Sequence, residues 1–267
     1  MQGRLEKMVA THDTPIRYEL VLNHQRVPLN QFIGKTVTLQ HTGNIYCLHC
    51  NMPTKKSFNQ GYCYSCFSRL AKCDMCMMKP EICHFNAGTC REPNWAQSFC
   101  FQPHFVYLSN TSGLKVGITR HNQIPTRWID QGAIQALPIF QVATRKMSGV
   151  IETLIARHVA DKTQWQRMLK HQIEPIDLLA ERDRLVAICA DELKQLNQNE
   201  MTFLTDANVV DLNYPIDIAP TKVSALNFDK TPHISGMLHG IKGQYLIFEK
   251  GVLNVRKFGG YEVIFSA

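Results

Sequence analysis

Several features that are common in proteins are missing from this sequence of 267 residues. No apolar run approaches the roughly 18 to 20 residues that a membrane-spanning helix requires, so a membrane partner is not expected. The start, MQGRLEKMVATHDTP, lacks the apolar stretch of a signal peptide, and we therefore expect a cytoplasmic protein. No Gly-rich fingerprint of flavin or nicotinamide binding is found, so no organic cofactor is expected.

Cysteine, by contrast, is plentiful and concentrated in one zone. Nine of the ten cysteines lie between Cys47 and Cys100, several of them in C-x-x-C pairs. A disulfide scaffold is typical of a short secreted chain, whereas this chain is long and 45% hydrophobic, which is enough for one large or two to three small domains. The pattern therefore favours metal binding over disulfides.

The net charge of +7 is unevenly distributed along the chain. Residues 105–170 contain nine basic and three acidic residues, whereas residues 171–206 contain three basic and eight acidic residues. A basic segment next to an acidic one indicates a surface for a polyanion, and a polymer of phosphodiesters is the obvious ligand. DNA or RNA is therefore the expected partner.

The sequence predicts an α+β protein with several domains. Short alternating β runs occur in 18–46 and in 221–265, and neither segment has enough strands to form a stable sheet alone. We therefore expect the N-terminal strands of 1–46 to pair with the C-terminal β-domain in one small barrel or sandwich. The other units are a zinc-binding module, a mixed α/β domain, a helical segment and the C-terminal β-domain. Their predicted ranges are 47–104, 105–170, 171–206 and 207–267.

The helical segment has a single amphipathic pattern. Residues 175–197 begin with Pro175 and acidic residues and carry an apolar stripe that includes Cys189. One helix is therefore predicted there, with Cys189 in the core rather than at a metal.

The strongest local motif is a pair of C-x-x-C knuckles. Cys47, Cys50, Cys63 and Cys66 have the spacing C-x2-C-x12-C-x2-C, which places four thiolates at the corners of a tetrahedron. This pattern predicts a structural zinc site. The lysines and tyrosines around it suit either a nucleic-acid surface or the simple neutralisation of thiolate charge.

A second set of potential ligands follows directly. Cys73 and Cys76 are its safest members, and Cys83 and Cys90 are favoured to complete a tetrahedron, with Cys100, His104 and His84 as rivals. Seven groups exceed one site, so the set holds one zinc ion with spare ligands or two ions. Thiolate spacing alone also leaves an iron–sulfur cluster open.

The mixed zone is predicted to have the order ββαβα. A hairpin of residues 105–108 and 114–119 precedes a short helix containing Arg127, a strand over 136–143, and a helix capped by Ser148. Gly117 stands inside the second strand, where glycine usually marks the close approach of a ligand or another backbone. We expect that ligand to be phosphate.

In order and spacing, these residues resemble the GIY-YIG nuclease domain over about 65 residues. Tyr107 in VYL stands at the tyrosine of the first motif, and KVG, residues 115–117, stands at the second motif with Lys115 in place of its tyrosine. Arg127 and Glu152 fall where that family has its arginine and its metal-binding glutamate. The late asparagine of the nuclease pattern has no clear counterpart. The whole chain also resembles a bacterial family catalogued only as a domain of unknown function.

The resemblance implies a catalytic set of Tyr107, Lys115, Arg127 and Glu152. Phosphodiester hydrolysis needs a group that activates water, a cation at the phosphate and a metal at the leaving oxygen. Tyr107 would take the proton of the water, Lys115 would lower the pKa of Tyr107 or contact phosphate, Arg127 would bind the phosphate, and Glu152 would hold Mg²⁺. Nucleic acid is expected to contact the basic residues Lys115, Arg120, Arg127, Arg145 and Lys146.

Two functions follow from these observations. The first is a divalent-metal-dependent nuclease, and the second is a DNA- or RNA-binding module with structural zinc and no turnover. Each residue of the catalytic set also has an ordinary structural interpretation, such as a packed tyrosine, an edge-strand lysine or an ion pair between two helices. The sequence does not decide whether the protein is an enzyme.

Overall fold

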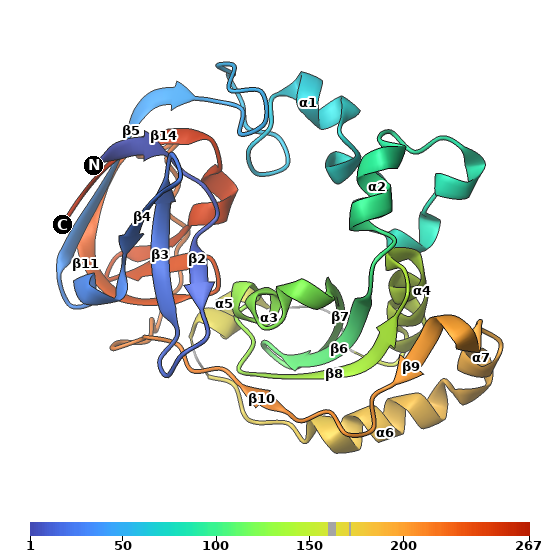
Figure 1. The fold of residues 1–267 in the computed structure, drawn as a ribbon. Helices are drawn as coiled ribbons and strands as arrows, with labels where there is room; N and C mark the ends of the chain where they lie inside the picture. The colour runs from blue at the N-terminus through green and yellow to red at the C-terminus, as the bar shows by residue number, and fades with distance from the viewer. Residues whose placement is uncertain (160–163, 171) are drawn as a thin grey trace.

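Three parts of the chain form a ring in this computed structural model, which describes residues 1–159, 164–170 and 172–267. A β-rich part contains both chain ends, the cysteine zone forms an arm at the top of Figure 1, and a mixed sheet with its helices lies below. No helix in the described part of the chain has the length and apolar character needed to cross a membrane.

The β-rich part joins strands from both chain ends, as predicted. Its larger sheet has the order β1-β14-β5-β11-β12-β13, and a smaller sheet has the order β2-β3-β4. Strand β5 lies between two C-terminal strands, with Gln40 opposite both His233 and Ile264. The strands are β1 (Gln2–Arg4), β2 (Val9–Thr11), β3 (Arg17–Leu22), β4 (Gln25–Pro28), β5 (Thr36–Ile45), β11 (His233–Lys242), β12 (Tyr245–Phe248), β13 (Gly251–Asn254) and β14 (Tyr261–Ser266), with the short helical turns η1 (Asn30–Phe32) and η8 (Val255–Phe258).

The barrel alternative for this part is wrong. Within the described residues, β1 and β13 form the two ends of the larger sheet and are not hydrogen-bonded to each other. Side chains that alternate along the strands, such as Leu20, Leu39 and Leu246, are fully buried in one core that both sheets share. The two sheets are therefore held together by apolar packing rather than by closure.

The mixed part has the predicted order β6, β7, α3, β8, α4. Its sheet runs β10-β8-β6-β7, with β9 beside β8, and Tyr107 of β6 lies opposite Gly117 of β7. The predicted hairpin is thereby confirmed. The elements are β6 (His104–Asn110), β7 (Leu114–Arg120), η6 (His121–Gln123), α3 (Thr126–Asp130), β8 (Gln135–Val142), α4 (Arg145–Ala156), η7 (Gln198–Glu200), β9 (Met201–Phe203) and β10 (Val210–Asp211).

Helix α4 begins earlier than predicted. Thr144 is its N-cap and accepts a hydrogen bond from the backbone N–H of Met147 at 3.2 Å. Ser148, the predicted cap, lies inside the first turns, where its buried hydroxyl donates to the carbonyl of Arg145 at 2.7 Å. The prediction of Ser148 as cap is wrong because Thr144 offers the same chemistry one turn earlier, and Arg145 thereby becomes helical.

The helical segment is broken where one helix was predicted. Asp177 caps α6 (Leu178–Ile188), and the separate α7 (Ala190–Lys194) follows, while α5 (Trp165–Leu169) lies earlier in the chain. Cys189 stands at the break and is 1% exposed, so its predicted place in the core is confirmed. Together α4 and α6 cover one face of the mixed sheet. On the opposite face, Tyr107 of β6 and Trp128 of α3 pack into the core of the β-rich part.

The cysteine zone consists of short helices and turns. It begins after β5 and returns to the mixed sheet at β6. Its elements are α1 (Tyr64–Arg69), η2 (Ala71–Cys73), η3 (Met75–Met77), η4 (Pro80–Ile82), η5 (Phe85–Ala87) and α2 (Pro93–Phe99).

Candidate functional site

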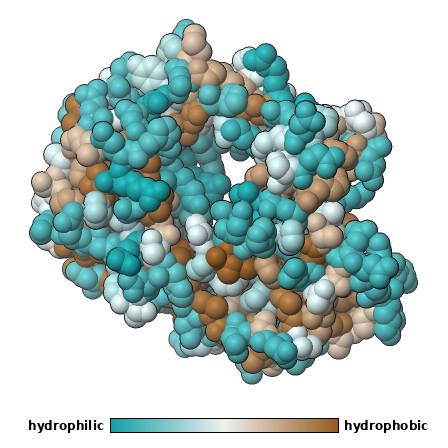
Figure 2. Space-filling model, in the orientation of Figure 1, coloured by the Kyte–Doolittle hydropathy of each residue, from teal (hydrophilic) through white to brown (hydrophobic). Residues whose placement is uncertain are grey.

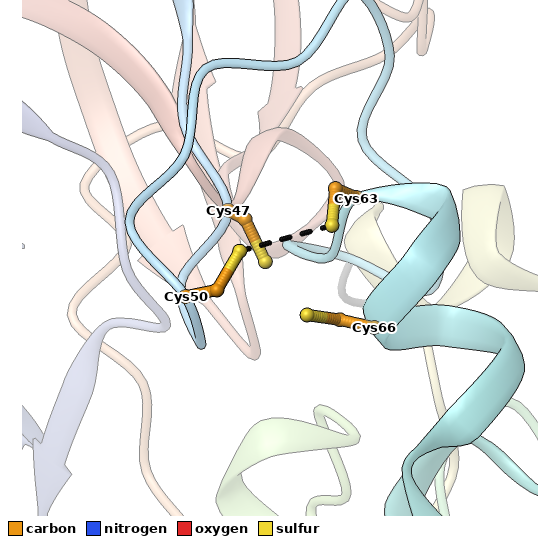
Figure 3. A group of neighbouring side chains, drawn as sticks. All are labelled: Cys47, Cys50, Cys63 and Cys66. Carbon is orange, nitrogen blue, oxygen red and sulfur yellow. Dashed lines mark hydrogen bonds between the residues drawn. The ribbon is translucent and has the colours of Figure 1, made fainter.

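The four cysteines of the first motif meet as predicted. Cys47 and Cys50 lie in the loop after β5, and Cys63 and Cys66 lie at the start of α1 (Figure 3). All four sulfur atoms lie within 4.8 Å of one another, and the Sγ atoms of Cys50 and Cys63 are 3.8 Å apart. A tetrahedron with zinc–sulfur bonds of about 2.3 Å has sulfur–sulfur edges of about 3.8 Å. The donor set therefore fits a four-coordinate metal ion such as zinc.

The electrostatics of this cluster also favour a cation. Burial opposes ionisation of Cys47, but the backbone N–H groups of Cys50, Cys63 and His49 lower the pKa of its thiol to about 6. Burial and the neighbouring thiols raise the pKa of Cys66 to about 12. Cys47 therefore ionises readily, whereas its negative charge opposes ionisation of Cys66, and a positive ion at the centre of the cluster would offset that repulsion.

The second set of predicted ligands is divided between different places. Cys73 packs against the cluster of Cys47, Cys66 and Leu70 and faces the central cavity described below. His104 is fully buried at the start of β6, and its Nδ1–H donates to the carbonyl of Gln102 at 2.7 Å. Burial lowers the pKa of His104 to about 4, so this imidazole is neutral at physiological pH.

A cavity of about 500 Å³ lies between the three parts of the molecule. Figure 2 shows an opening at the centre of the space-filling view, bounded by predominantly hydrophilic residues. The β-rich part, the cysteine zone and the mixed part each contribute basic side chains to the lining of this central cavity. These are Lys7, Lys72, Arg120, Arg127, Arg145 and Arg256.

Both carboxylates in the lining of the central cavity are already paired. Asp130, whose side chain is 4% exposed, forms an ion pair with Lys7 and accepts a hydrogen bond from Gln244 at 2.9 Å. Asp74 accepts from the guanidinium of Arg91 at 2.7 Å. These pairs leave the positive charges of the arginines dominant in the cavity.

Among these arginines, Arg127 lies close enough to Arg145 and to Arg256 to repel each of them. Burial lowers the pKa of Arg145 and of Arg256, and the positive charge of Arg127 lowers both pKa values further. The Nη2 group of Arg145 donates to the carbonyl of Met77 at 2.7 Å, while its buried Nε–H has no hydrogen-bond partner among the described residues. An anion in the cavity would relieve the repulsion and could satisfy such a donor.

The central cavity also has an apolar wall. Phe67, Phe99 and the methionines Met75 and Met78 contribute to it, and Met78 is 78% exposed. The guanidinium of Arg120 lies over the ring of Phe99, 4.2 Å from its centroid. Cationic and apolar groups therefore face the same space.

Gly117 accommodates a side chain rather than a ligand. A Cβ atom at this position would lie 2.7 Å from both the Cζ and the hydroxyl oxygen of Tyr107 on the paired strand. The ring of Tyr107 is fully buried, and its hydroxyl donates to the Oε1 of Gln131 at 2.5 Å. The expectation that phosphate passes over Gly117 is corrected by this contact: the group that requires the glycine is Tyr107.

The predicted catalytic residues lie near one another but do not all face one cavity. Burial raises the pKa of Tyr107, with Arg127 and Glu152 near enough to act on it in opposite directions. The expected lowering of the Tyr107 pKa is therefore not found, because burial raises it. Lys115 lies on the edge strand β7 and lines a neighbouring cavity of about 220 Å³, which shares Asp130 and Arg256 with the central cavity.

Residues 34–263 match a family described as "Protein of unknown function (DUF2797)". The chain belongs to this family. The expected membership in a family of unknown function is thereby confirmed. A search of curated proteins and a search of solved structures each gave no match.

In this DUF2797 chain, only three of the five basic residues predicted to contact nucleic acid line the central cavity. Arg120, Arg127 and Arg145 line it, whereas Lys146 lines a smaller cavity beside Cys83 and Cys100. The predicted set did not name Lys7, Lys72 or Arg256, although Lys72 is one of the lysines around the first motif for which a nucleic-acid surface was one of two interpretations. These three come from distant segments, and nothing in the local sequence around Lys7 indicates its place.

Proposed function

We propose that this protein binds single-stranded nucleic acid in the central cavity and holds zinc at Cys47, Cys50, Cys63 and Cys66. The observation that carries the proposal is the convergence of six basic side chains from three parts of the chain on one cavity. Basic grooves of this kind bind the phosphodiester backbone, which supplies most of the affinity in non-specific complexes.

The size of the cavity favours single strands over duplexes. Its volume of about 500 Å³ is in the range of pockets for small ligands, roughly 300–1,000 Å³. Such a space admits about one or two unpaired nucleotides at a time. A duplex is too wide to enter it, since its major groove alone is about 12 Å across. The aromatic and methionine side chains of the apolar wall offer surfaces on which unpaired bases stack.

Binding of labelled single strands at several salt concentrations tests this proposal. Because the cavity admits one or two nucleotides, about two phosphates are neutralised there, and the logarithm of the affinity is expected to fall with the logarithm of salt with a slope of roughly −1.4, at roughly −0.7 per contact. The double variant Arg120→Gln, Arg256→Gln removes two of the cations and is expected to weaken binding and to make this slope smaller in magnitude.

A matched variant controls for net charge. Arg17 and Arg26 are exposed on β3 and β4 and do not line the central cavity. The double variant Arg17→Gln, Arg26→Gln loses the same charge, and we expect it to bind as the unmodified chain does. Equal losses in the two double variants would indicate a diffuse electrostatic effect and would contradict a site in the cavity.

We propose metal-dependent phosphodiester cleavage as a second candidate function. It is favoured by the proximity of Arg127, Arg145 and Glu152, whose charges act on one another beside the cavity. This grouping agrees with the resemblance to the GIY-YIG domain. Tyr107 is a poor general base here because its raised pKa keeps it protonated at neutral pH. In this candidate, Arg127 binds the phosphate and Glu152 supplies a carboxylate of the kind that Mg²⁺ prefers.

Cleavage assays with Glu152→Gln separate the two candidates. A nuclease gives products from labelled single-stranded, duplex or branched DNA or RNA in Mg²⁺, none in EDTA, and none with the variant, which still binds. Salt-sensitive binding without products from any substrate supports the non-catalytic function. Metal analysis of the same sample distinguishes zinc from iron and thereby tests the iron–sulfur alternative.

A further inference from the structure

The cavity of about 220 Å³ that Lys115 lines, called the side cavity from here on, lies next to the central cavity. The two cavities share Asp130 and Arg256, so a strand that contacts Arg256 lies at the edge of both. Strands β12 and β13 and turn η8 contribute to one wall of the side cavity, and β7, the end of α3 and α5 contribute to the other. The side cavity therefore lies at the seam between the β-rich part and the mixed part.

Two aromatic rings line the side cavity. The rings of Trp165 on α5 and Tyr245 on β12 are parallel to within 6°, with their centroids 6.0 Å apart. Both residues are half-buried, so the core does not enclose them completely. Aromatic faces beside a basic groove are the surfaces on which unpaired bases stack in single-strand complexes.

The two rings are held from behind by a small apolar cluster. Helix α5 packs against β12 and β13 there, and Trp165 and Tyr245 lie at the border of the cluster. Its buried members are Met168, Leu169, Ile247 and Val252. Because the rings are already fixed, a ligand that stacks on them loses little free energy to the ordering of side chains.

The polar groups of the side cavity are partly committed to the protein. The amide of Gln244 donates to Asp130 at 2.9 Å and exchanges two hydrogen bonds with the backbone of Met8, at 2.9 and 3.1 Å. The Oε1 of Gln131 accepts from the hydroxyl of Tyr107 at 2.5 Å, whereas its Nε2 makes no hydrogen bond to any of the described residues. Gln131 thus offers an oriented N–H donor, and every base carries acceptor atoms at its edge.

The size and charge of the side cavity restrict its ligand. A volume of about 220 Å³ is below the roughly 300 Å³ at which pockets for small molecules begin, so it suits one ring system rather than a whole nucleotide. Asp130 is paired with Lys7, so the cations Lys115 and Arg256 dominate the charge of the lining. A base with its phosphate outside, at the shared Arg256, satisfies both restrictions.

We propose that the side cavity takes up one unpaired base of a strand that lies in the central cavity. The base stacks on Trp165 and Tyr245, Gln131 donates a hydrogen bond to its edge, and Arg256 binds the adjoining phosphate. This inference rests on the proposed nucleic-acid function and deepens it, because the strand is then held by a base as well as by its phosphates.

Strand binding by variants of Trp165 tests the stacking contact. Trp165→Leu is expected to weaken the binding of labelled single strands by about 5- to 150-fold, the range of one base–aromatic contact, and Trp165→Phe, which keeps a ring, is expected to retain most of the affinity. Tyr64→Leu is the matched control, since Tyr64 is 66% exposed on α1 and lies outside both cavities. Unchanged affinity in Trp165→Leu, or an equal loss in Tyr64→Leu, would overturn the proposal.

A strand without bases separates stacking from phosphate binding. An abasic oligomer of the same length is expected to bind equally well to the unmodified chain and to Trp165→Leu, because it has nothing to stack. The same loss for the abasic and the base-bearing strand would show that Trp165 acts through the fold and would contradict a base in the side cavity.

A mononucleotide tests the side cavity without any strand. The chain has three tryptophans, and in Trp95→Phe the two that remain are Trp165 and Trp128, which is 1% exposed. Adenosine monophosphate is expected to quench the fluorescence of this variant saturably, and ribose 5-phosphate is not. Absence of saturable quenching by adenosine monophosphate, or equal quenching by ribose 5-phosphate, would refute the base site.

The two outcomes together distinguish the inference from the function on which it rests. If adenosine monophosphate quenches Trp165 but no strand binds, the base site stands and the proposed strand binding fails. If strands bind with equal affinity to the unmodified chain and to Trp165→Leu, the proposed function stands and the base site fails.

Discussion

The contact between Gly117 and Tyr107 predicts a large cost for a single methyl group. In Gly117→Ala the new Cβ would lie 2.7 Å from the Cζ and hydroxyl of Tyr107, a separation that real Cβ atoms do not tolerate. The tyrosine cannot move easily, because it is fully buried, bonded to Gln131 and packed edge to face on Trp128 at 5.9 Å. Overpacking of a filled core costs about 1–3 kcal/mol.

Thermal unfolding of the full chain measures this cost. At roughly 2–4 °C per kcal/mol for a chain of this size class, the melting temperature of Gly117→Ala is expected to fall by about 2–12 °C. Gly236→Ala is the matched control, since its Cβ would lie 3.6 Å from the carboxylate of Glu249, an ordinary contact, and its melting temperature should change little.

A double-mutant cycle identifies the partner. If the clash with Tyr107 causes the loss, Gly117→Ala costs much less in a Tyr107→Leu background than in the unmodified chain. Additive losses would show that the two residues are not coupled. An unchanged melting temperature for Gly117→Ala would refute the reasoning from packing, and a phosphate contact would again be the better account of the glycine.

Two further predictions concern a buried lysine and the first metal cluster. Burial lowers the pKa of Lys242 to about 7 in the folded chain, whereas the unfolded chain keeps this proton up to about pH 10.5. Between pH 7 and 10.5 the unfolded state therefore binds more protons than the folded state, and the free energy of unfolding rises with pH. Relative to Lys242→Met, the unmodified chain should therefore gain up to about 1.4 kcal/mol per pH unit between pH 7.5 and 9 in denaturant unfolding, and parallel curves would contradict this. Removal of metal should expose residues 47–73 to protease while the sheets stay folded. The reason is that the buried apolar cluster of this segment contains only Cys47, Cys66 and Leu70 among the described residues. Equal protection from protease with and without a chelator would show that no metal orders this segment.

Local patterns in the sequence predicted what short-range interactions determine. Alternating apolar residues gave the hairpin of β6 and β7, and C-x-x-C spacing gave the first cluster, because both depend on neighbours a few residues apart. The helix boundaries were less accurate. Thr144 and Ser148 are both suitable caps, and the sequence alone does not distinguish them, because either hydroxyl can accept from a backbone N–H at the start of the helix.

The central cavity depends on contacts that no local pattern records. Lys7, Lys72 and Arg256 are separated by many residues and meet only because the chain ends pair in one sheet system and the cysteine zone folds back beside it. The role of Gly117 has the same origin. Its sequence position shows that a side chain is missing, but only the register of β6 against β7 places Tyr107 opposite it.

The most direct test of the central claim is photo-crosslinking of a single strand that carries 4-thiouridine, followed by mapping of the modified peptides. We predict crosslinks to the apolar wall of the central cavity, at Phe67, Met75, Met78 or Phe99, that disappear at high salt and in Arg120→Gln, Arg256→Gln. Crosslinks confined to the outer surface, for example on α6, or the same yield in that double variant, would contradict the account.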